Sequence, residues 1–99
     1  MNKEKVYGYL CAYCIGRKRV TSSQALEKTL NLSGNELRKQ INALRREGIP
    51  IASNSEGYFY AENAADIYGT IRSLQKMRRG LDAAITGLEQ ALEKFGDAS

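Results

Sequence analysis

Apolar residues recur at helical spacing in three short segments within the first 48 residues. The first segment covers about residues 3–15 and ends at Gly16, the second is about two turns long, and the third ends at Gly48. The expected inward-facing residues are Val6, Leu10, Tyr13 and Cys14, then Ala25, Leu26 and Leu30, and then Leu37, Ile41 and Leu44. The pattern therefore predicts three amphipathic helices in close succession.

The second and third helices each begin with a sequence typical of a capping box. In this motif a Ser or Thr hydroxyl and a Glu or Gln three residues later satisfy free backbone N–H groups at the helix start. The first box runs from Thr21 to Gln24 and the second from Ser33 to Glu36. The short segment around Asn31 is left for a tight turn, so the two helices predict a helix-turn-helix.

Two β-rich runs follow, over residues 49–53 and 58–61. Between them lie the turn-forming residues from Asn54 to Gly57, which predicts a hairpin. Pro50 restricts the first strand to an edge or to a position whose N–H is unpaired. Tyr58 and Tyr60 share one strand face and Phe59 the other, and we expect these rings to pack within the protein and not to stack on bases.

From Asn63, a candidate N-cap, to about Phe95 the chain is predicted to be a single helix. Its apolar residues alternate at spacings of four and three, which is a heptad pattern with Arg78 as the one vacancy. Because the pattern continues across Gly80, one helix is preferred to a helical hairpin. A helix about 45 Å long outreaches a small domain, so we expect a homodimer whose helices pair in either direction. The predicted seam consists of Ile71, Leu74, Leu81, Ile85, Leu88 and Leu92, with Ile67 and Phe95 continuing the pattern at its ends.

The end of the third helix and the hairpin resemble the winged-helix domains at the N-termini of bacterial biotin-operon-repressor-type regulators. The resemblance lies in Leu44-Arg45-Arg46-Glu47-Gly48-Ile49-Pro50-Ile51 and in Gly57-Tyr58, and it covers residues 3–61. The first helix, with Cys11-Ala12-Tyr13-Cys14, and the long C-terminal helix are most similar to small winged-helix proteins encoded in prophages of Gram-positive bacteria.

This resemblance implies that the third helix is the recognition helix and the hairpin the wing. It also implies that residues 17–20 form a brief strand beside the wing, with Val20 as its anchor. The expected fold class is accordingly mainly α with a small β-hairpin wing, a winged helix-turn-helix followed by a long coiled-coil-like helix.

Length and charge fit this organisation. The chain has 99 residues, which we divide into a domain over residues 1–61 and a dimerisation helix with a short tail over residues 62–99. Residues 1–61 hold ten Lys and Arg against five Asp and Glu, a net charge of +5, whereas residues 62–99 hold five against six, or −1. A basic excess on the helix-turn-helix indicates a polyanionic partner. No segment resembles a signal peptide or a membrane span, so we expect a soluble, cytoplasmic protein.

The outer face of the third helix is the main candidate for DNA contact. At helical spacing, Asn35, Lys39, Asn42 and Arg46 lie opposite the core stripe, with Arg38 and Arg45 on the flank. Asn pairs with adenine and Arg with guanine in the major groove, and Lys and Arg also neutralise phosphates. An ordinary solvated helix face intersperses acids among its cations, and this face has none, which favours DNA binding.

Two further groups are candidates for contacts to the DNA backbone. Ser22 and Ser23 open the second helix, where free N–H groups favour a phosphate, although capping alone explains each of them equally well. In the wing, Asn54 and Ser55 could reach the backbone or minor groove, but Glu56 is repulsive there. Phosphate contact by Arg17, Lys18 and Arg19 is an equally good alternative to contact by the wing.

Other chemistry is poorly represented. Cys11 and Cys14 form a C-x-x-C, but the chain has no His and no other Cys, so it could supply only half of a structural zinc site. Both are expected to be small packing residues. Without His, acid–base catalysis has few candidates. We expect no enzyme activity, no metal, no cofactor and no small-molecule effector. The cluster of Lys76, Arg78 and Arg79 is a weaker candidate for a phosphate or an acidic partner.

We therefore expect sequence-specific binding to double-stranded DNA by a dimeric, phage-type transcriptional regulator, most simply a repressor. One alternative is a protein-interaction module that binds a replication or host protein and whose basic face is incidental. Another keeps DNA binding but assigns it to replication or packaging. Salt-dependent binding to duplex DNA separates the interaction module from the other two.

Overall fold

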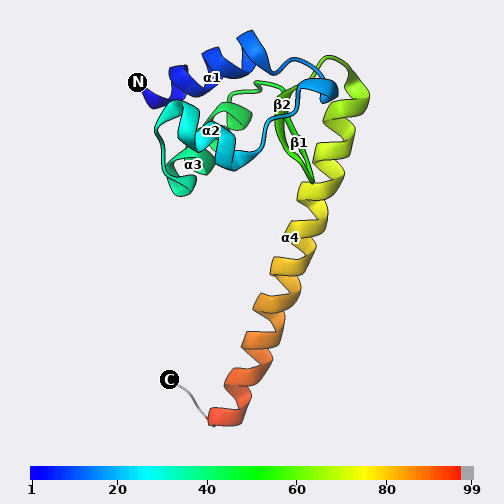
Figure 1. Ribbon diagram of the computed structural model, residues 1–99. Coiled ribbons are helices and arrows are strands. Elements are labelled where there is room, and N and C mark those ends of the chain that lie inside the picture. Colours follow the sequence, from blue (N-terminus) through cyan, green and yellow to red (C-terminus); the bar gives the residue numbers. More distant parts are fainter. Residues whose placement is uncertain (97–99) are drawn as a thin grey trace.

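The computed structural model describes residues 1–96 and is mainly helical, with one antiparallel hairpin (Figure 1). Three helices come first: α1 (Asn2–Tyr13), α2 (Ser23–Leu30) and α3 (Gly34–Arg46). The hairpin of β1 (Ile51–Asn54) and β2 (Gly57–Tyr60) follows, with Ile51 opposite Tyr60 and Asn54 opposite Gly57. The chain then enters α4 (Ala64–Leu92), which ends in a 3₁₀ turn at Glu93–Phe95. The predicted order of the four helices and the hairpin is confirmed, and the end of the predicted C-terminal tail lies outside the described residues.

The first three helices and β1 bury one apolar core. It contains Val6, Leu10, Cys14, Leu26, Leu30, Leu37, Ile41, Leu44 and Ile51. The helical stripes predicted for α1 and α3 are confirmed, but two predicted core residues are exposed, Tyr13 and Ala25. Tyr13 is the last residue of α1, and its ring packs on Tyr9 at 4.9 Å between centroids, so it stays on the outer surface.

Capping fixes where the helices begin, although one cap differs from the prediction. Ser33 caps α3 as expected, its hydroxyl accepting a hydrogen bond from the Glu36 N–H at 3.1 Å. The cap of α2 is Ser22, which accepts from the Ala25 N–H at 3.1 Å, and not Thr21 with Gln24. The backbone of Thr21 is paired with Tyr58, so Thr21 belongs to the sheet and the helix starts one residue later.

The segment over residues 17–19 is a 3₁₀ turn, and the predicted strand there is wrong. Sheet pairing occurs on either side of it instead. Ile15 forms a parallel bridge to Tyr60, and Thr21 an antiparallel bridge to Tyr58 through N–H···O bonds of 3.0 and 2.9 Å. Gly16, with a φ of 87°, lets the chain leave β2 and return to it. Val20, the predicted anchor, packs beside the hairpin in a second apolar cluster.

The first two turns of α4 are attached to this domain. Ile67 packs with Val20 against Ala52, Phe59 and Ala61. Two polar residues on the same face of α4 are buried and fully bonded. Asp66 accepts from the Glu62 N–H at 3.2 Å and from Arg17 Nη2 at 3.3 Å. Thr70 accepts from the Ser53 N–H at 3.0 Å and donates to the Asp66 carbonyl oxygen at 3.2 Å.

These contacts extend the folded domain about ten residues past the predicted boundary at residue 61. The direction in which α4 leaves the domain is therefore fixed by Phe59, Asp66 and Thr70, each of which is buried.

Beyond Thr70, α4 leaves the domain and runs alone (Figure 1). Asn63 caps it as predicted, accepting from the Asp66 N–H at 3.0 Å, and the helix passes through Gly80 and Gly87 without a break. Every predicted seam residue is at least 40 % exposed. Among residues 1–96, no helix combines the length and the hydrophobicity needed to cross a membrane.

Candidate nucleic-acid interface

The outer face of α3 carries amide and cationic side chains, because its other face is committed to the core. Leu37, Ile41 and Leu44 are buried. The residues predicted opposite and beside them, Asn35, Arg38, Lys39, Asn42 and Arg46, lie on the surface. Among the described residues, none of the three cations on this face forms a salt bridge. Their positive charge is therefore available to an external anion.

The two acids of α3 and its C-cap are directed to the α1 side of the domain. Glu36 accepts hydrogen bonds from the Asn2 side chain at 3.3 Å and from Gln40 Nε2. These bonds, that from Gln40 first, hold the pKa of the Glu36 carboxyl below its ordinary value. Glu47 pairs with Lys3, and this contact raises the pKa of the Lys3 ammonium. Neither carboxylate is left to repel a phosphate beside the outer face.

Within the outer face, Arg38 Nη2 donates to Asn35 Oδ1. The two side chains are one turn apart on α3, so this bond restricts both rotamers at the N-terminal end of the face. A fixed guanidinium loses less conformational entropy when it contacts DNA than a free one. Asn42 makes no side-chain hydrogen bond to another described residue, and its amide is open to solvent.

Arg45, predicted on the flank, is turned inward and half-buried. Its Nε donates to the Ile51 carbonyl oxygen at 2.9 Å, and its Nη2 donates to Ser53 Oγ at 3.1 Å. The guanidinium lies 5.8 Å from the centroid of the Tyr58 ring, and burial lowers its pKa. Arg45 therefore joins α3 to the hairpin, a positioning role that the sequence analysis missed. Its spacing gave no signal, because a flank position is compatible with either direction.

The start of α2, the tip of the hairpin and α4 border one hollow of about 350 Å³, which has polar residues on the side of α2 and the hairpin and Leu74 and Met77 on the side of α4. The predicted backbone contacts Ser22, Ser23, Asn54 and Ser55 all line it, and so does Arg45. Two of these residues already have internal bonds. Ser22 caps α2, and Asn54 Oδ1 accepts from the Glu56 N–H at 2.8 Å. The structure thus brings together predicted residues from two segments that are about 30 residues apart, and links them to α3 through Arg45.

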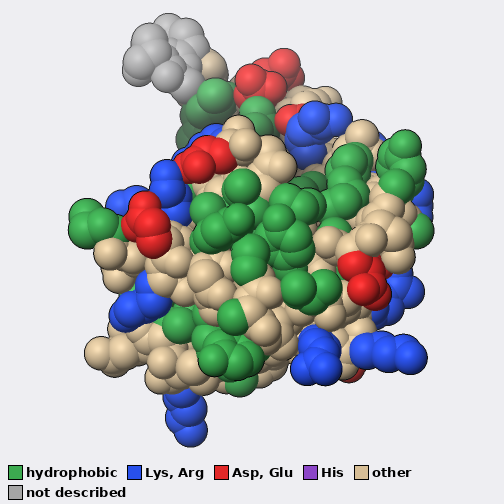
Figure 2. All heavy atoms as spheres, turned by 90° about the horizontal axis from the view of Figure 1, so that it is seen from above, with side chains coloured by type: hydrophobic (Ala, Val, Ile, Leu, Met, Phe, Trp, Pro, Cys, Tyr) green, Lys and Arg blue, Asp and Glu red, His purple; other side chains and the backbone are tan. Residues whose placement is uncertain are grey.

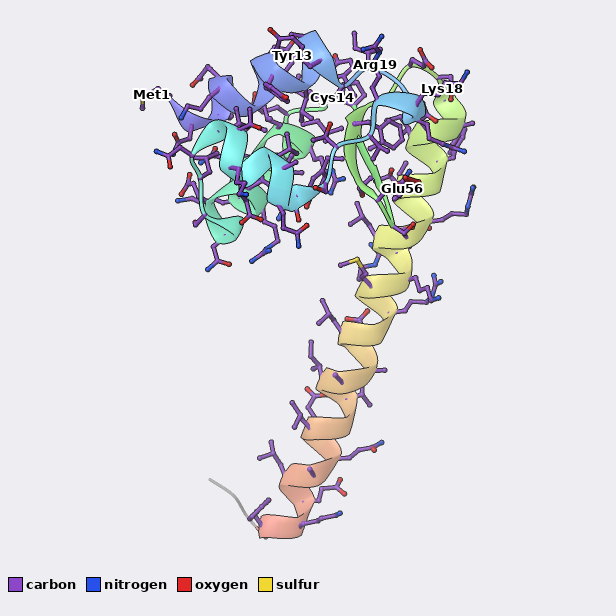
Figure 3. The ribbon with its side chains drawn as sticks, viewed as in Figure 1. Met1, Tyr13, Cys14, Lys18, Arg19 and Glu56 are labelled. Carbon is purple, nitrogen blue, oxygen red and sulfur yellow. The ribbon has the colours of Figure 1, made fainter. Side chains whose placement is uncertain are left out.

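The predicted contacts Arg17, Lys18 and Arg19 lie elsewhere. Figure 3 places Lys18 and Arg19 at the upper edge of the domain, beside the start of α4, whereas α3 lies at the lower edge. Arg17 is paired with the buried Asp66, which gives it a structural role. The three residues of this turn therefore do not form one surface with the outer face of α3.

The face of the domain over α1 has a different chemistry. Figure 2 looks down on this face and shows hydrophobic side chains across its middle, with Lys and Arg toward its margin. Tyr7, Tyr13 and Ile15 are exposed at 38 %, 63 % and 47 %. Sequence reasoning assigned Tyr13 to the core and did not single out the other two, so this apolar face was missed.

No metal site is formed in the part of the chain that the structure describes. Cys14 is buried with its Sγ 3.3 Å from Thr21 Oγ1, and Cys11 is a partly exposed free thiol. Within residues 1–96 there is no group of three or more His, Cys, Asp or Glu side chains placed to hold an ion.

Comparison with protein-family models, with curated proteins and with solved structures finds no match for this chain. A function has to be argued from the residues themselves.

Proposed function

We propose that the protein binds double-stranded DNA as a dimeric winged-helix regulator, most simply a transcriptional repressor. The observation that carries this proposal is the outer face of α3, where Arg38, Lys39 and Arg46 lie on the surface and lack carboxylate partners within residues 1–96, and Asn42 stands among them. Cations supply affinity for phosphates, and amides read base edges in the major groove.

Three features of the geometry support this reading. Glu36 and Glu47 are bonded on the α1 side, so neither acid lies among the cations of the outer face. The hollow beside it is lined by Ser22, Ser23, Asn54 and Ser55, whose hydroxyl and amide groups suit phosphate oxygens. Glu56 also lines it and would oppose a phosphate at the tip of the hairpin, so the proposed contact is at the Ser22 side. Arg45 fixes the hairpin to α3, so a wing and a recognition helix would meet DNA as one rigid unit.

The dimer is supported by the exposed stripe of α4. Leu81, Ile85, Leu88 and Leu92 are between 54 % and 71 % exposed. Leaving such a side chain in water forfeits roughly 1.5–3 kcal/mol, so a stripe of them favours association with a second stripe. Two domains held together would contact two half-sites at once, which raises the effective affinity of weak single-site binding.

The test is binding to duplex DNA at several salt concentrations. Replacing Lys39 or Arg46 by Ala should weaken binding to all duplexes and reduce the slope of log K against log salt by about 0.9 for each lost phosphate contact. Lys94→Ala is the matched control, because Lys94 is an exposed cation in the 3₁₀ turn after α4, far from α3. It should change neither the affinity for DNA nor the salt slope. No binding to any duplex at low salt would overturn the proposal.

Asn42 provides a separate test of base reading. Site selection from random duplexes would first identify a preferred sequence. Asn42→Ala should then cost roughly 1–3 kcal/mol on the preferred duplex and little on an unrelated one, because an amide neutralises no phosphate. If Asn42→Ala lowers the affinity for both duplexes equally, Asn42 does not read a base, and the α3 face contacts DNA without sequence preference.

A second candidate function is protein interaction through the apolar face over α1. It is favoured by the exposure of Tyr7, Tyr13 and Ile15, since aromatic residues are enriched at the centres of protein interfaces. A replication or host protein would be the partner, and the basic face would be incidental. A replication or packaging role that keeps DNA binding predicts the same salt dependence as a repressor, and the position of the selected sites relative to promoters or origins would distinguish them.

A further inference from the structure

An open apolar groove lies where α4 leaves the domain. It measures about 460 Å³ and is lined mainly by Ile49, Pro50, Ile51, Ile67, Ile71 and Leu74. The last two of these belong to the exposed heptad stripe of α4. The groove and the stripe are therefore one continuous apolar surface, and whatever covers the stripe near Ile71 also covers the groove.

The stripe has one charged member, and it restricts how two copies can pair. In a parallel, in-register pair each seam residue meets its own equivalent, so Arg78 would face the partner's Arg78 in the middle of the seam. Two like charges in a partly desolvated layer repel. No acid of the partner adjoins Arg78 in this pairing, because its parallel neighbours across the interface are Leu74, Met77 and Leu81.

Reversing one helix removes the conflict. Residues at the first heptad position of one helix, which are Ile71, Arg78, Ile85 and Leu92, then face residues at the fourth position of the other, which are Leu74, Leu81, Leu88 and Phe95. With the two-fold axis at Ala83, Ile71 faces the partner's Phe95 and Leu74 faces the partner's Leu92. Arg78 faces the partner's Leu88 beside the partner's Glu89, which has the opposite charge. Every seam residue from Ile71 to Phe95 has a facing residue in this register.

A shift of one heptad fits worse in either direction. One shift leaves Ile71 and Leu74 without a facing residue in the partner's α4 or in its 3₁₀ turn, which ends at Phe95. The other brings the partner's end past Ile67, which is already packed against the hairpin.

We propose that the protein forms an antiparallel dimer in which the C-terminal end of each α4 fills the partner's groove. The partner's Phe95 and Leu92 face Ile71 and Leu74, which line that groove. The length of α4 agrees with this arrangement. The helix ends at Leu92, its 3₁₀ turn ends at Phe95, and Gly96 with a φ of 72° turns the backbone away where the partner's domain begins. The inference rests on the dimer of the proposed function and adds its direction and its contact with the domain.

Engineered cysteines distinguish the two directions. Leu74→Cys and Leu92→Cys are each introduced in a Cys11→Ser chain, where the remaining Cys14 is buried. In the antiparallel dimer, two copies of either position are about 27 Å apart along the axis. Neither variant alone should then cross-link, whereas the two co-expressed with different tags should yield a mixed disulfide dimer. Ser73→Cys co-expressed with Leu92→Cys is the control, because Ser73 lies outside the seam.

Cross-linking of each single variant with itself would overturn the antiparallel direction. Sedimentation of the uncross-linked protein tests separately whether a dimer forms at all. A monomer would overturn both the dimer and this inference, whereas DNA binding by the α3 face would remain to be judged by its own salt dependence.

A Trp reporter tests whether the groove is filled. The chain contains no Trp, so Phe95→Trp gives a single indole. Its emission should shift to the blue as the protein concentration crosses the dimer dissociation constant, because the ring enters the partner's groove. Lys94→Trp should keep the emission of a water-exposed indole at all concentrations. An emission that stays water-like in a dimer of the Phe95→Trp protein would overturn the filling of the groove by the partner's residue 95.

Discussion

The domain over residues 1–70 and the distal part of α4 use the same kinds of residue in opposite circumstances. In the domain, apolar residues at helical spacing are buried, among them Leu26 and Leu37 with no exposed area. In α4 after Thr70, the equally regular residues of the heptad seam are all exposed. Periodicity alone therefore predicts that a face is apolar but not what covers it. The domain covers its own apolar residues, whereas nothing within residues 1–96 covers the seam of the distal helix.

Glycines show the same contrast. Gly57 joins β1 to β2 with a φ of 145°, and a Cβ added there would lie 2.1 Å from the Thr21 carbonyl oxygen. A Cβ on Gly80 or Gly87 of α4 would meet nothing within 4 Å. The first glycine is required by the close approach of two backbone segments, and the other two only weaken a helix.

The largest expected effect is that of Gly57→Ala. Strain at this φ and a clash with backbone atoms should together cost roughly 3 kcal/mol or more in the free energy of unfolding, measured by urea denaturation. Gly80→Ala is the matched control. It should stabilise α4 by up to about 1 kcal/mol, because Ala is the better helix former. A Gly57→Ala protein as stable as the parent would mean that the hairpin does not rest on Thr21.

An intermediate effect is expected from the charge in the seam. Arg78→Glu should weaken the proposed antiparallel dimer by up to roughly fivefold, since in that dimer it would replace an attraction to the partner's Glu89 by a repulsion. Adding Glu89→Arg should restore the affinity, measured by sedimentation equilibrium at low salt. The two positions are about three turns apart within one chain, so the rescue reports on the contact between chains. Arg79→Glu, outside the seam, is the control, and failure of the double variant to recover would contradict the antiparallel register.

Much of this architecture could be predicted from local sequence. The cap residues Ser33 and Asn63, the core stripe of α3 and the unbroken α4 all follow from patterns within a few residues, and the structure agrees with them. The strand expected at residues 17–20 came from a resemblance and is replaced by a 3₁₀ turn. Local patterns describe one element at a time, and they succeed where one element decides the structure.

The roles of Arg45 and Arg17 were missed because each depends on a contact with another element of the fold. Arg45 lies on a helix flank, and only the folded hairpin offers it the Ile51 carbonyl oxygen. Arg17 was one of the alternative candidates for phosphate contact, and the sequence alone does not show that it pairs with Asp66, 49 residues away. For Asp66 a signal existed, since an Asn three residues before an Asp is typical of a helix start. The outer face of α3 could be predicted, because it lies opposite an apolar stripe that is visible in the sequence of the same helix.

The smallest expected effect concerns Glu36, which ties α3 to α1 and has no counterpart in the distal helix. Hydrogen bonds from Gln40 and Asn2 lower the pKa of its carboxyl in the folded protein. A lowered folded-state pKa stabilises the fold above the pKa of the unfolded chain, and this contribution is lost as the pH falls through the folded-state pKa. Glu36→Gln should therefore reduce the loss of stability that begins at about pH 5 and continues below it.

Stability of the two proteins would be measured by urea denaturation in steps from neutral to acid pH. Glu93→Gln is the control at the end of α4, since Glu93 makes no side-chain hydrogen bond within residues 1–96, and it should leave the pH profile unchanged. Gln40→Ala should flatten the profile in the same sense as Glu36→Gln, and the two substitutions together should do little more than either alone, because they remove the same bond. Additive effects would mean that Gln40 acts on the pH profile through a group other than Glu36.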